Sequence, residues 1–233
     1  MKSPITYHDD FDQGSELWLQ ARCGVLTASN LNLIMTPTLK VARNEKERQH
    51  MYELLAQRIT GYVEPQYVSD AMLRGHEDEI HARAEYERAY APVQTCGFIT
   101  NARHGFTLGY SPDGLVGTDG LIEIKSRRQK YQVETLLNNV PADRCPDDFL
   151  LQCQGALLIS ERQWLDFISY CGGLPMCVIR VWPDPKVQEA ILDATFMFEA
   201  ALAKRLTEYR DLLNSDSVRL IPTVRRVEEE MMI

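Results

Sequence analysis

The sequence of 233 residues contains no run of 18 apolar residues, the length that a membrane-spanning helix needs. The segment Met1 to Asp12 is polar and acidic, without the apolar stretch that directs secretion. Among the six cysteines there is no Cys-x-x-Cys pair, which disfavours a zinc site. We therefore expect a soluble cytoplasmic protein with free thiols and no membrane partner.

Positive charge is also scarce, since 25 Lys and Arg stand against 33 Asp and Glu and give a net charge of −8. This balance excludes a protein that coats DNA through bulk positive charge, although local basic patches can still contact DNA. The sequence has no glycine-rich phosphate loop and no convincing Ser/His/Asp series among its five histidines. These absences disfavour a nucleotide-dependent metabolic enzyme and a serine hydrolase.

The most informative pattern present is Ser-Pro-Asp-Gly-Leu ending at residue 115, followed by Leu-Ile-Glu-Ile-Lys ending at residue 125. Asp113 lies on a tight turn, and alternation along the following strand places Glu123 and Lys125 on one face while Ile122 and Ile124 face a core. Carboxylates are the ligands that Mg²⁺ prefers, and a lysine beside the metal can orient or deprotonate a water molecule. The pattern therefore indicates phosphodiester hydrolysis.

This pattern alone is weak evidence, because surface strands with a Glu and a Lys on one face are common. Glu79, on the charged helix before the strands, can complete an acidic cluster, and Gln152 can reach the same cleft from a later helix. The alternative for both is a solvated surface position.

A second group of residues is typical of an anion site. Arg22 and Ser29 flank a helix start at Thr27, where free N–H groups and the helix dipole favour a phosphate. The alternative is that Arg22 lies on the surface and Ser29 is an ordinary first-turn residue. Trp18 is expected to anchor the core.

A basic trio, Arg127, Arg128 and Lys130, follows directly after Lys125. It is either a local DNA contact or a solvated loop.

Periodicity predicts an α/β fold with a mixed central β-sheet flanked by helices, in a single domain over residues 1–233. The expected helices are a short one between Ser15 and Gly24, then 27–35, 47–59, 71–90, 129–138, 147–160 and 186–213. The expected strands are 95–100, 106–110, 114–116, 121–125, 164–170 and 176–182. The motif-bearing core spans about 14–182, and the last helix and a tail span about 184–233.

Five motifs in order resemble the phage lambda exonuclease family of viral recombination nucleases, within the PD-(D/E)xK superfamily, which shares a restriction-endonuclease-like core. They are Trp18-x3-Arg22-x-Gly24-Val25-x-Thr27-Ala28-Ser29, Gly75-x3-Glu79-x2-Ala82, Ser111-Pro112-Asp113-Gly114-Leu115, Glu123-x-Lys125 and Gln152-x-Gln154. The resemblance covers about residues 14 to 160.

The resemblance implies a Mg²⁺-dependent 5′→3′ exonuclease, with Mn²⁺ as a possible substitute, that digests one strand of linear duplex DNA and leaves a 3′ overhang. It implies metal binding by Asp113, Glu123 and the Ile124 carbonyl, with Glu79 in the acidic site. It further implies that Lys125 positions or activates water with support from Gln152, and that Arg22, Ser29 and Ser111 hold the 5′-phosphate.

The same resemblance implies a ring-shaped homotrimer, a phage single-strand annealing protein as partner, and action in the cytoplasm of a bacterial host. The last helix and its tail, with Arg225, Arg226 and Glu228 to Glu230, are a candidate docking element. Two alternatives remain: another PD-(D/E)xK nuclease, such as a restriction or repair endonuclease, and a non-catalytic DNA-binding scaffold. An endonuclease needs no end-binding pocket, and a scaffold usually loses one of the acids or the lysine.

Overall fold

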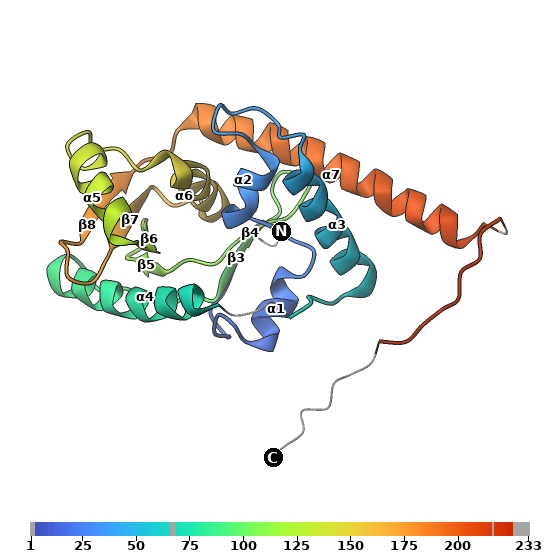
Figure 1. Cartoon of the computed structure of the whole chain (residues 1–233), viewed down its shortest axis with the longest axis horizontal. Helices are drawn as coiled ribbons and strands as arrows, with labels where there is room; N and C mark the ends of the chain where they lie inside the picture. The colour runs from blue at the N-terminus through green and yellow to red at the C-terminus, as the bar shows by residue number, and fades with distance from the viewer. Residues whose placement is uncertain (1–2, 66–68, 216, 226–233) are drawn as a thin grey trace, which may run out of the picture.

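The computed structural model describes residues 3–65, 69–215 and 217–225, and it is a mixed α/β structure (Figure 1). The α-helices are α1 (Glu16–Arg22), α2 (Leu31–Ile34), α3 (Glu45–Thr60), α4 (Asp70–Ala89), α5 (Gln129–Glu134), α6 (Asp147–Ser160) and α7 (Pro185–Leu213). The strands are β1 (Ile5–His8), β2 (Leu26–Thr27), β3 (Phe98–Asn101), β4 (Leu108–Tyr110), β5 (Gly114–Val116), β6 (Gly120–Ser126), β7 (Trp164–Tyr170) and β8 (Cys177–Val181).

The strands form two four-stranded mixed sheets instead of the one sheet expected from the sequence. The first has the order β1-β3-β4-β2, and the second has the order β5-β6-β7-β8 with β6 and β7 parallel. The chain passes from the first sheet to the second between β4 and β5, through Ser111, Pro112 and Asp113. This crossing places the Ser-Pro-Asp turn at the junction of the sheets.

Helices cover both faces of β6, and the alternation of its side chains explains why. Ile122 and Ile124 pack with Ala82 and Tyr86 of α4 in one apolar cluster. On the other side, α6 contacts β7, β3, β4 and α7 and contributes to the larger core. Glu123 lies between these two apolar layers, which accounts for its burial.

Local capping explains where several helices begin. The hydroxyl of Ser15 accepts a hydrogen bond from the Trp18 amide at the start of α1, as the sequence predicted. The side chain of Asn44 accepts from the Glu47 amide and opens α3 two residues earlier than expected, and α3 ends at Gly61, whose φ is 63°. The Asp184 side chain accepts from the amides of Lys186 and Val187 and starts α7.

Three segments differ from the sequence expectation. The helix expected over 27–35 is split into strand β2, a 3₁₀ helix Ala28–Asn30 and the single turn α2. The helix expected over 129–138 is α5 followed by a π-helix, Thr135–Asn139. The N-terminal segment, where no strand was expected, contains β1, which pairs antiparallel with β3.

The six cysteines are free thiols, as predicted. No helix among the described residues has both the length and the apolar composition of a membrane span. Helix α7 projects beyond the rest of the molecule, and the chain leaves its end as an extended segment (Figure 1). In the candidate docking element, Arg225 stacks on Tyr62 with 3.6 Å to the ring centroid, whereas Arg226 and Glu228 to Glu230 lie outside the described residues.

A buried polar network fastens α4 to the second sheet. Asp166 of β7 is 2% exposed, and it accepts hydrogen bonds from the Tyr86 hydroxyl at 2.7 Å and from Arg180 at 2.8 and 2.9 Å. Replacing Asp166 with alanine leaves the buried hydroxyl without a partner, so we expect the free energy of unfolding to fall by about 2 kcal/mol in urea denaturation. Asp193→Ala, at an exposed position on α7, is the control and should change it by less than about 0.5 kcal/mol. Equal effects of the two substitutions would show that the network contributes nothing.

Candidate active site

The centre of the candidate site is Glu123, whose side chain is 2% exposed. One carboxylate oxygen, Oε2, accepts a hydrogen bond from the Tyr110 hydroxyl at 2.7 Å. The other, Oε1, accepts from Lys125 Nζ at 2.7 Å and from the Gln152 amide. The structure therefore brings Glu123, Lys125 and Gln152 together as the sequence predicted. Tyr110, the last residue of β4, is a partner that sequence reasoning missed.

Asp113 lies beside this group on the turn that joins the two sheets. Its Oδ2 accepts a hydrogen bond of 2.6 Å from the Ile124 amide. Burial raises the pKa of Asp113 well above its ordinary value, and the negative charges of Glu123 and Glu79 raise it further. The site thus concentrates negative charge where water is largely excluded.

Lys125 carries the compensating charge. Burial alone lowers the pKa of this lysine, but the nearby carboxylates of Glu123 and Asp113 outweigh burial and raise it above the ordinary value. In this arrangement Lys125 is an ammonium ion at neutral pH, so it donates hydrogen bonds and does not accept a proton.

Glu79 reaches the same cavity from α4, but its carboxylate is paired with Arg83 one turn further along the helix. Both side chains are about one quarter exposed, at 26% for Glu79 and 25% for Arg83. Sequence reasoning missed Arg83, although an Arg four residues after a Glu on a charged helix is the usual signal for such a pair.

A second group of side chains surrounds the Ser111 hydroxyl. Its oxygen accepts hydrogen bonds from Trp18 Nε1 at 2.9 Å and from Arg22 Nη1 at 3.0 Å. The Arg22 guanidinium also stacks on Trp18, 4.3 Å from the ring centroid. Trp18 is half-buried and lines the cavity, so the expectation that it anchors the core was wrong. Arg22 and Ser111 are brought together as predicted.

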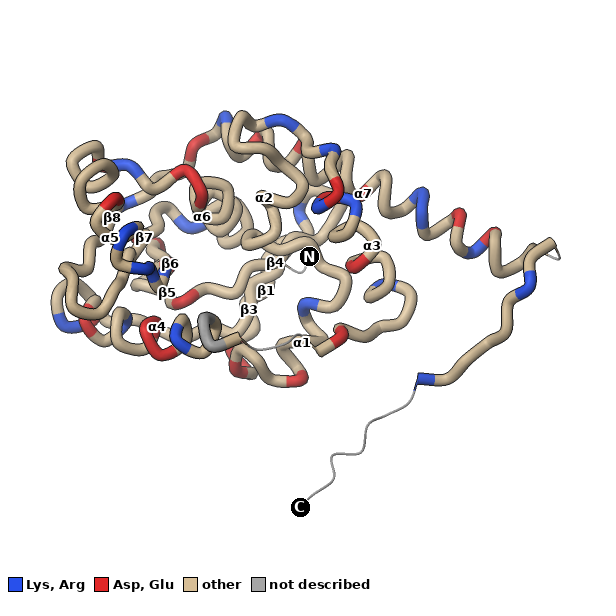
Figure 2. The backbone as a smooth tube through the Cα atoms, viewed as in Figure 1, with Lys and Arg blue, Asp and Glu red and all other residues tan. Residues whose placement is uncertain are grey.

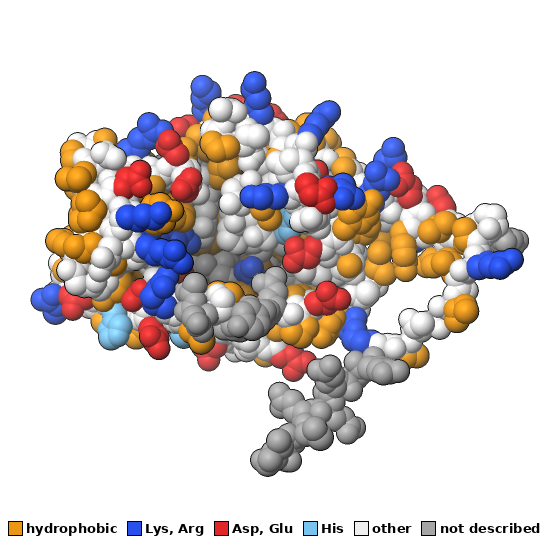
Figure 3. Space-filling view, in the orientation of Figure 1, with side chains coloured by type: hydrophobic (Ala, Val, Ile, Leu, Met, Phe, Trp, Pro, Cys, Tyr) orange, Lys and Arg blue, Asp and Glu red, His pale blue; other side chains and the backbone are white. Residues whose placement is uncertain are grey.

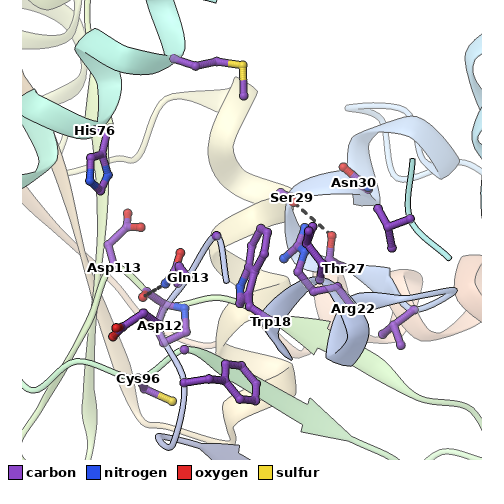
Figure 4. A pocket seen from close by; sticks show the side chains of 18 of the residues that line it. Asp12, Gln13, Trp18, Arg22, Thr27, Ser29, Asn30, His76, Cys96 and Asp113 are labelled. Carbon is purple, nitrogen blue, oxygen red and sulfur yellow. Dashed lines mark hydrogen bonds between the residues drawn. The ribbon is translucent and has the colours of Figure 1, made fainter. Parts of the chain in front are cut away.

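Ser29 also borders this cavity, but in a different setting from the expected one. It is exposed in the 3₁₀ helix, and its hydroxyl lies 3.1 Å from the Thr27 hydroxyl. Figure 4 shows Ser29, Thr27, Trp18 and Arg22 in one group. The expected helix dipole contributes little here, because only short helical turns follow Thr27.

One cavity of about 1120 Å³ extends from Trp18 and Arg22 to Glu79 and Asp113. Its lining includes Trp18, Arg22 and Ser29 at one end and Asp113 at the other (Figure 4). Glu79 also lines it. The space-filling view shows a hollow near the middle of one face of the molecule (Figure 3). Two acids of the candidate site and a half-buried arginine therefore open into the same space.

The donor set suits a divalent cation that prefers oxygen ligands. The carboxylate of Glu123 is close enough to Asp113 to raise the pKa of Asp113. A bound cation would relieve the repulsion between these two carboxylates. Over residues 3–65, 69–215 and 217–225, no three Asp, Glu, His or Cys side chains converge as a ready-made metal site. Glu79, held by Arg83, is the acid that stands apart.

Removing the Tyr110 hydroxyl tests whether the site is held by its hydrogen bonds. Tyr110 is 2% exposed, so Tyr110→Phe leaves a buried carboxylate oxygen of Glu123 without its donor. We expect this to lower the free energy of unfolding by about 1–2 kcal/mol, measured by denaturation without divalent cations. Tyr52→Phe, at a residue that is 45% exposed, is the matched control and should have no measurable effect. If the two variants have the same stability, the Tyr110 hydroxyl does not hold Glu123.

Comparison with known proteins identifies the family. The model of the YqaJ-like viral recombinase domain matches residues 17–163. A search of curated proteins finds no match. The crystal structure of an alkaline exonuclease from Laribacter hongkongensis is 31% identical, with a TM-score of 0.74 over 86% of this chain and 98% of that one. The same exonuclease in complex with dAMP gives a TM-score of 0.73 at the same identity and coverage.

A phage-related exonuclease from Haemophilus somnus is 11% identical and has a TM-score of 0.55 over 79% of this chain and 96% of that one, which shows a shared fold alone. The resemblance to the lambda exonuclease family and the α/β nuclease fold are thus confirmed. The chain belongs to the YqaJ-like viral recombinase family and shares the fold of an alkaline exonuclease.

Proposed function

We propose that this protein is a Mg²⁺-dependent exonuclease that degrades one strand of linear duplex DNA from a phosphorylated 5′ end and leaves a 3′ single-stranded overhang. The observation that carries the proposal is the shared cavity, whose lining includes Arg22 at one end and Glu79 and Asp113 at the other, with Glu123 and Lys125 close to Asp113. A nuclease that acts at ends needs a site for the terminal phosphate beside its cleavage site, and an endonuclease does not.

The state of Arg22 supports an anion as the ligand of the first group. Burial lowers the pKa of Arg22 to about 10, because its charge is removed from water, yet the guanidinium stays charged near neutral pH. None of the ion pairs among the described residues involves Arg22. A phosphate would supply the missing negative charge, and Ser29 and Ser111 would add hydroxyl groups.

In this proposal Asp113, Glu123 and the Ile124 carbonyl hold Mg²⁺, or Mn²⁺ in its place, with Glu79 contributing from α4. When bound, the cation supplies positive charge to the scissile phosphate and to the oxygens that attack and leave. Lys125 orients the attacking water through its ammonium group, and Gln152 holds Glu123 by donating to the same carboxylate oxygen as Lys125. Arg22 fixes the terminal phosphate, so that the next phosphodiester lies at the acidic cluster.

Two partners belong to the same proposal and rest on membership of the family. A homotrimeric ring would enclose the duplex and keep the enzyme on DNA between successive cuts. A phage single-strand annealing protein in the bacterial cytoplasm would take up the overhang. The dAMP complex of the Laribacter enzyme supports a nucleotide as ligand, because dAMP is the product expected when single 5′-phosphorylated nucleotides are released.

The test is to incubate the protein and Mg²⁺ with linear duplex DNA labelled at its 5′ or its 3′ end, beside a covalently closed circle. Early release of mononucleotides from the phosphorylated 5′ end, with the circle intact, is the expected result. Cutting of the circle would favour an endonuclease, release from the 3′ end would reverse the polarity, and binding without cutting would favour a scaffold.

A further inference from the structure

Arg127 is a second cation beside the candidate site, after Lys125, and the proposed function gives it no role. Its guanidinium lies over two aromatic rings, 5.0 Å from the centroid of Phe149 and 5.2 Å from that of Tyr131. Lys125 Nζ lies 5.6 Å from the centroid of the same Phe149 ring. Arg127 and Lys125 are therefore separated by about one aromatic side chain.

The backbone places Arg127 in line with the candidate catalytic residues. Its amide donates to the Tyr170 carbonyl at 2.7 Å, so the pairing of β6 with β7 continues one residue beyond β6. Glu123, Lys125 and Arg127 are every second residue, so their side chains lie on one face of the strand, and each is about 7 Å from the next along the chain. This separation is close to that of successive phosphates in a DNA strand.

The positive charge of Arg127 has no acidic partner among the described residues. The side chain is half-buried, its Nε atom is buried and has no hydrogen-bond acceptor, and none of the ion pairs among the described residues includes it. A buried, unpaired donor is costly unless a ligand satisfies it.

The support under Arg127 is rigid. Tyr131 precedes Gln132, which is fully buried and donates to the carbonyls of Ser169 and Pro175 at 3.1 and 2.7 Å. Its Oε1 also accepts from the Ser169 hydroxyl at 2.6 Å. Helix α5 is thereby fixed to the end of β7, so the aromatic surface on which Arg127 rests has a defined position.

The three members of the basic trio are not equivalent. Arg127 lies over the Phe149 and Tyr131 rings, whereas Arg128 is exposed before α5, and Lys130 is exposed with its Nζ 4.6 Å from the Tyr131 ring centroid. Figure 2 shows basic residues gathered beside β6 and α5. In Figure 1, α5 and α1 lie on either side of β6. Arg127 precedes α5 and Arg22 is the last residue of α1, so the two arginines belong to segments on either side of the strand that carries Glu123 and Lys125.

We propose that Arg127 binds the backbone phosphate that follows the scissile one in the degraded DNA strand. This inference rests on the proposed function, because it takes the 5′-phosphate to lie at Arg22 and the scissile phosphate at Asp113 and Glu123. The strand then crosses the site from α1 towards α5, and Arg127 holds it in register as each nucleotide is removed.

The test measures binding alone, without divalent cations, so that no DNA is cut. The probes are 5′-phosphorylated duplexes in which one linkage at a time is a neutral methylphosphonate. For the wild-type protein, neutralising the linkage after the scissile one should weaken binding about 10-fold. Arg127→Ala should weaken binding to the unmodified duplex by a similar factor. In this variant, neutralising the linkage after the scissile one should weaken binding no further.

Arg128→Ala is the matched control, because it removes the same charge from the adjacent position. In Arg128→Ala, neutralising the linkage after the scissile one should still weaken binding about as much as in the wild-type protein, whereas in Arg127→Ala it should not. The melting temperature and circular dichroism spectrum of Arg127→Gln show whether the variant is still folded, so that a loss of contact can be told from a loss of fold. The slope of log K against log salt concentration should fall in this variant by the amount expected for about one phosphate contact.

An unchanged response of Arg127→Ala to that linkage, or the same behaviour in Arg128→Ala, would overturn the inference. Because only binding is measured, this outcome is distinguishable from failure of the proposed activity, which the end-labelled cleavage assay reads separately.

Discussion

Replacing Lys125 with alanine is expected to reduce the single-turnover rate of cleavage of linear duplex DNA by roughly 10²- to 10⁴-fold. The ammonium group donates to Glu123 at 2.7 Å, and the charges of Glu123 and Asp113 both act on it. Without it, the attacking water loses an orienting donor and the developing negative charge on the phosphate loses a stabilising group. Binding of DNA ends should change by less than about threefold, because Arg22 and Ser111 are intact.

The measurement compares cleavage of 5′-labelled duplex in Mg²⁺ with equilibrium binding in its absence. Lys204→Ala is the control, since Lys204 is an exposed residue of α7 whose side chain is 77% accessible. A near wild-type rate for Lys125→Ala would exclude Lys125 from the chemistry. Equal loss of binding and cleavage would instead mean that Lys125 holds the substrate.

Replacing Arg22 with alanine is expected to remove the preference for phosphorylated ends. A charge-assisted hydrogen bond to a buried phosphate is worth about 1.5–3 kcal/mol, so kcat/KM on 5′-phosphorylated duplex should fall about 10- to 100-fold. On 5′-hydroxyl duplex the same variant should lose much less, because no terminal phosphate is present to contact. The ratio of the two rates is the quantity to measure, and it is independent of enzyme concentration.

Arg205→Ala serves as the control for a general loss of positive charge, because Arg205 lies on the exposed side of α7 and pairs with Glu208. Equal losses of Arg22→Ala on both kinds of end would place the terminal phosphate elsewhere. A selective loss would identify the group around Ser111 as the end-binding pocket.

Much of this site could be predicted because its residues lie on regular elements or short turns. Alternation along β6 was sufficient to place Glu123 and Lys125 on one face, and the tight turn at Asp113 follows from the Pro and Gly on either side of it. Local patterns of this kind do not depend on the rest of the chain.

Contacts between distant segments could not be predicted in the same way. Tyr110 reaches Glu123 because the chain changes sheets at Ser111, and no local pattern shows that change. Strand β1 is short and its side chains are half-buried or exposed, so only its pairing with β3, at least ninety positions along the chain, defines it. The expected helix after Thr27 failed for a related reason, since β2 pairs with β4 and extends the backbone there.

The Ser111 hydroxyl has a further consequence for what the cavity accepts. A hydroxyl oxygen has two lone pairs and one proton, and here the indole of Trp18 and the guanidinium of Arg22 both donate to that oxygen. The Ser111 hydroxyl proton therefore remains for a ligand, and it can only be donated. The Trp18 and Arg22 nitrogens are likewise donors, so the group around Ser111 favours a ligand that offers lone pairs, whereas the carboxylates at the other end of the cavity favour a cation.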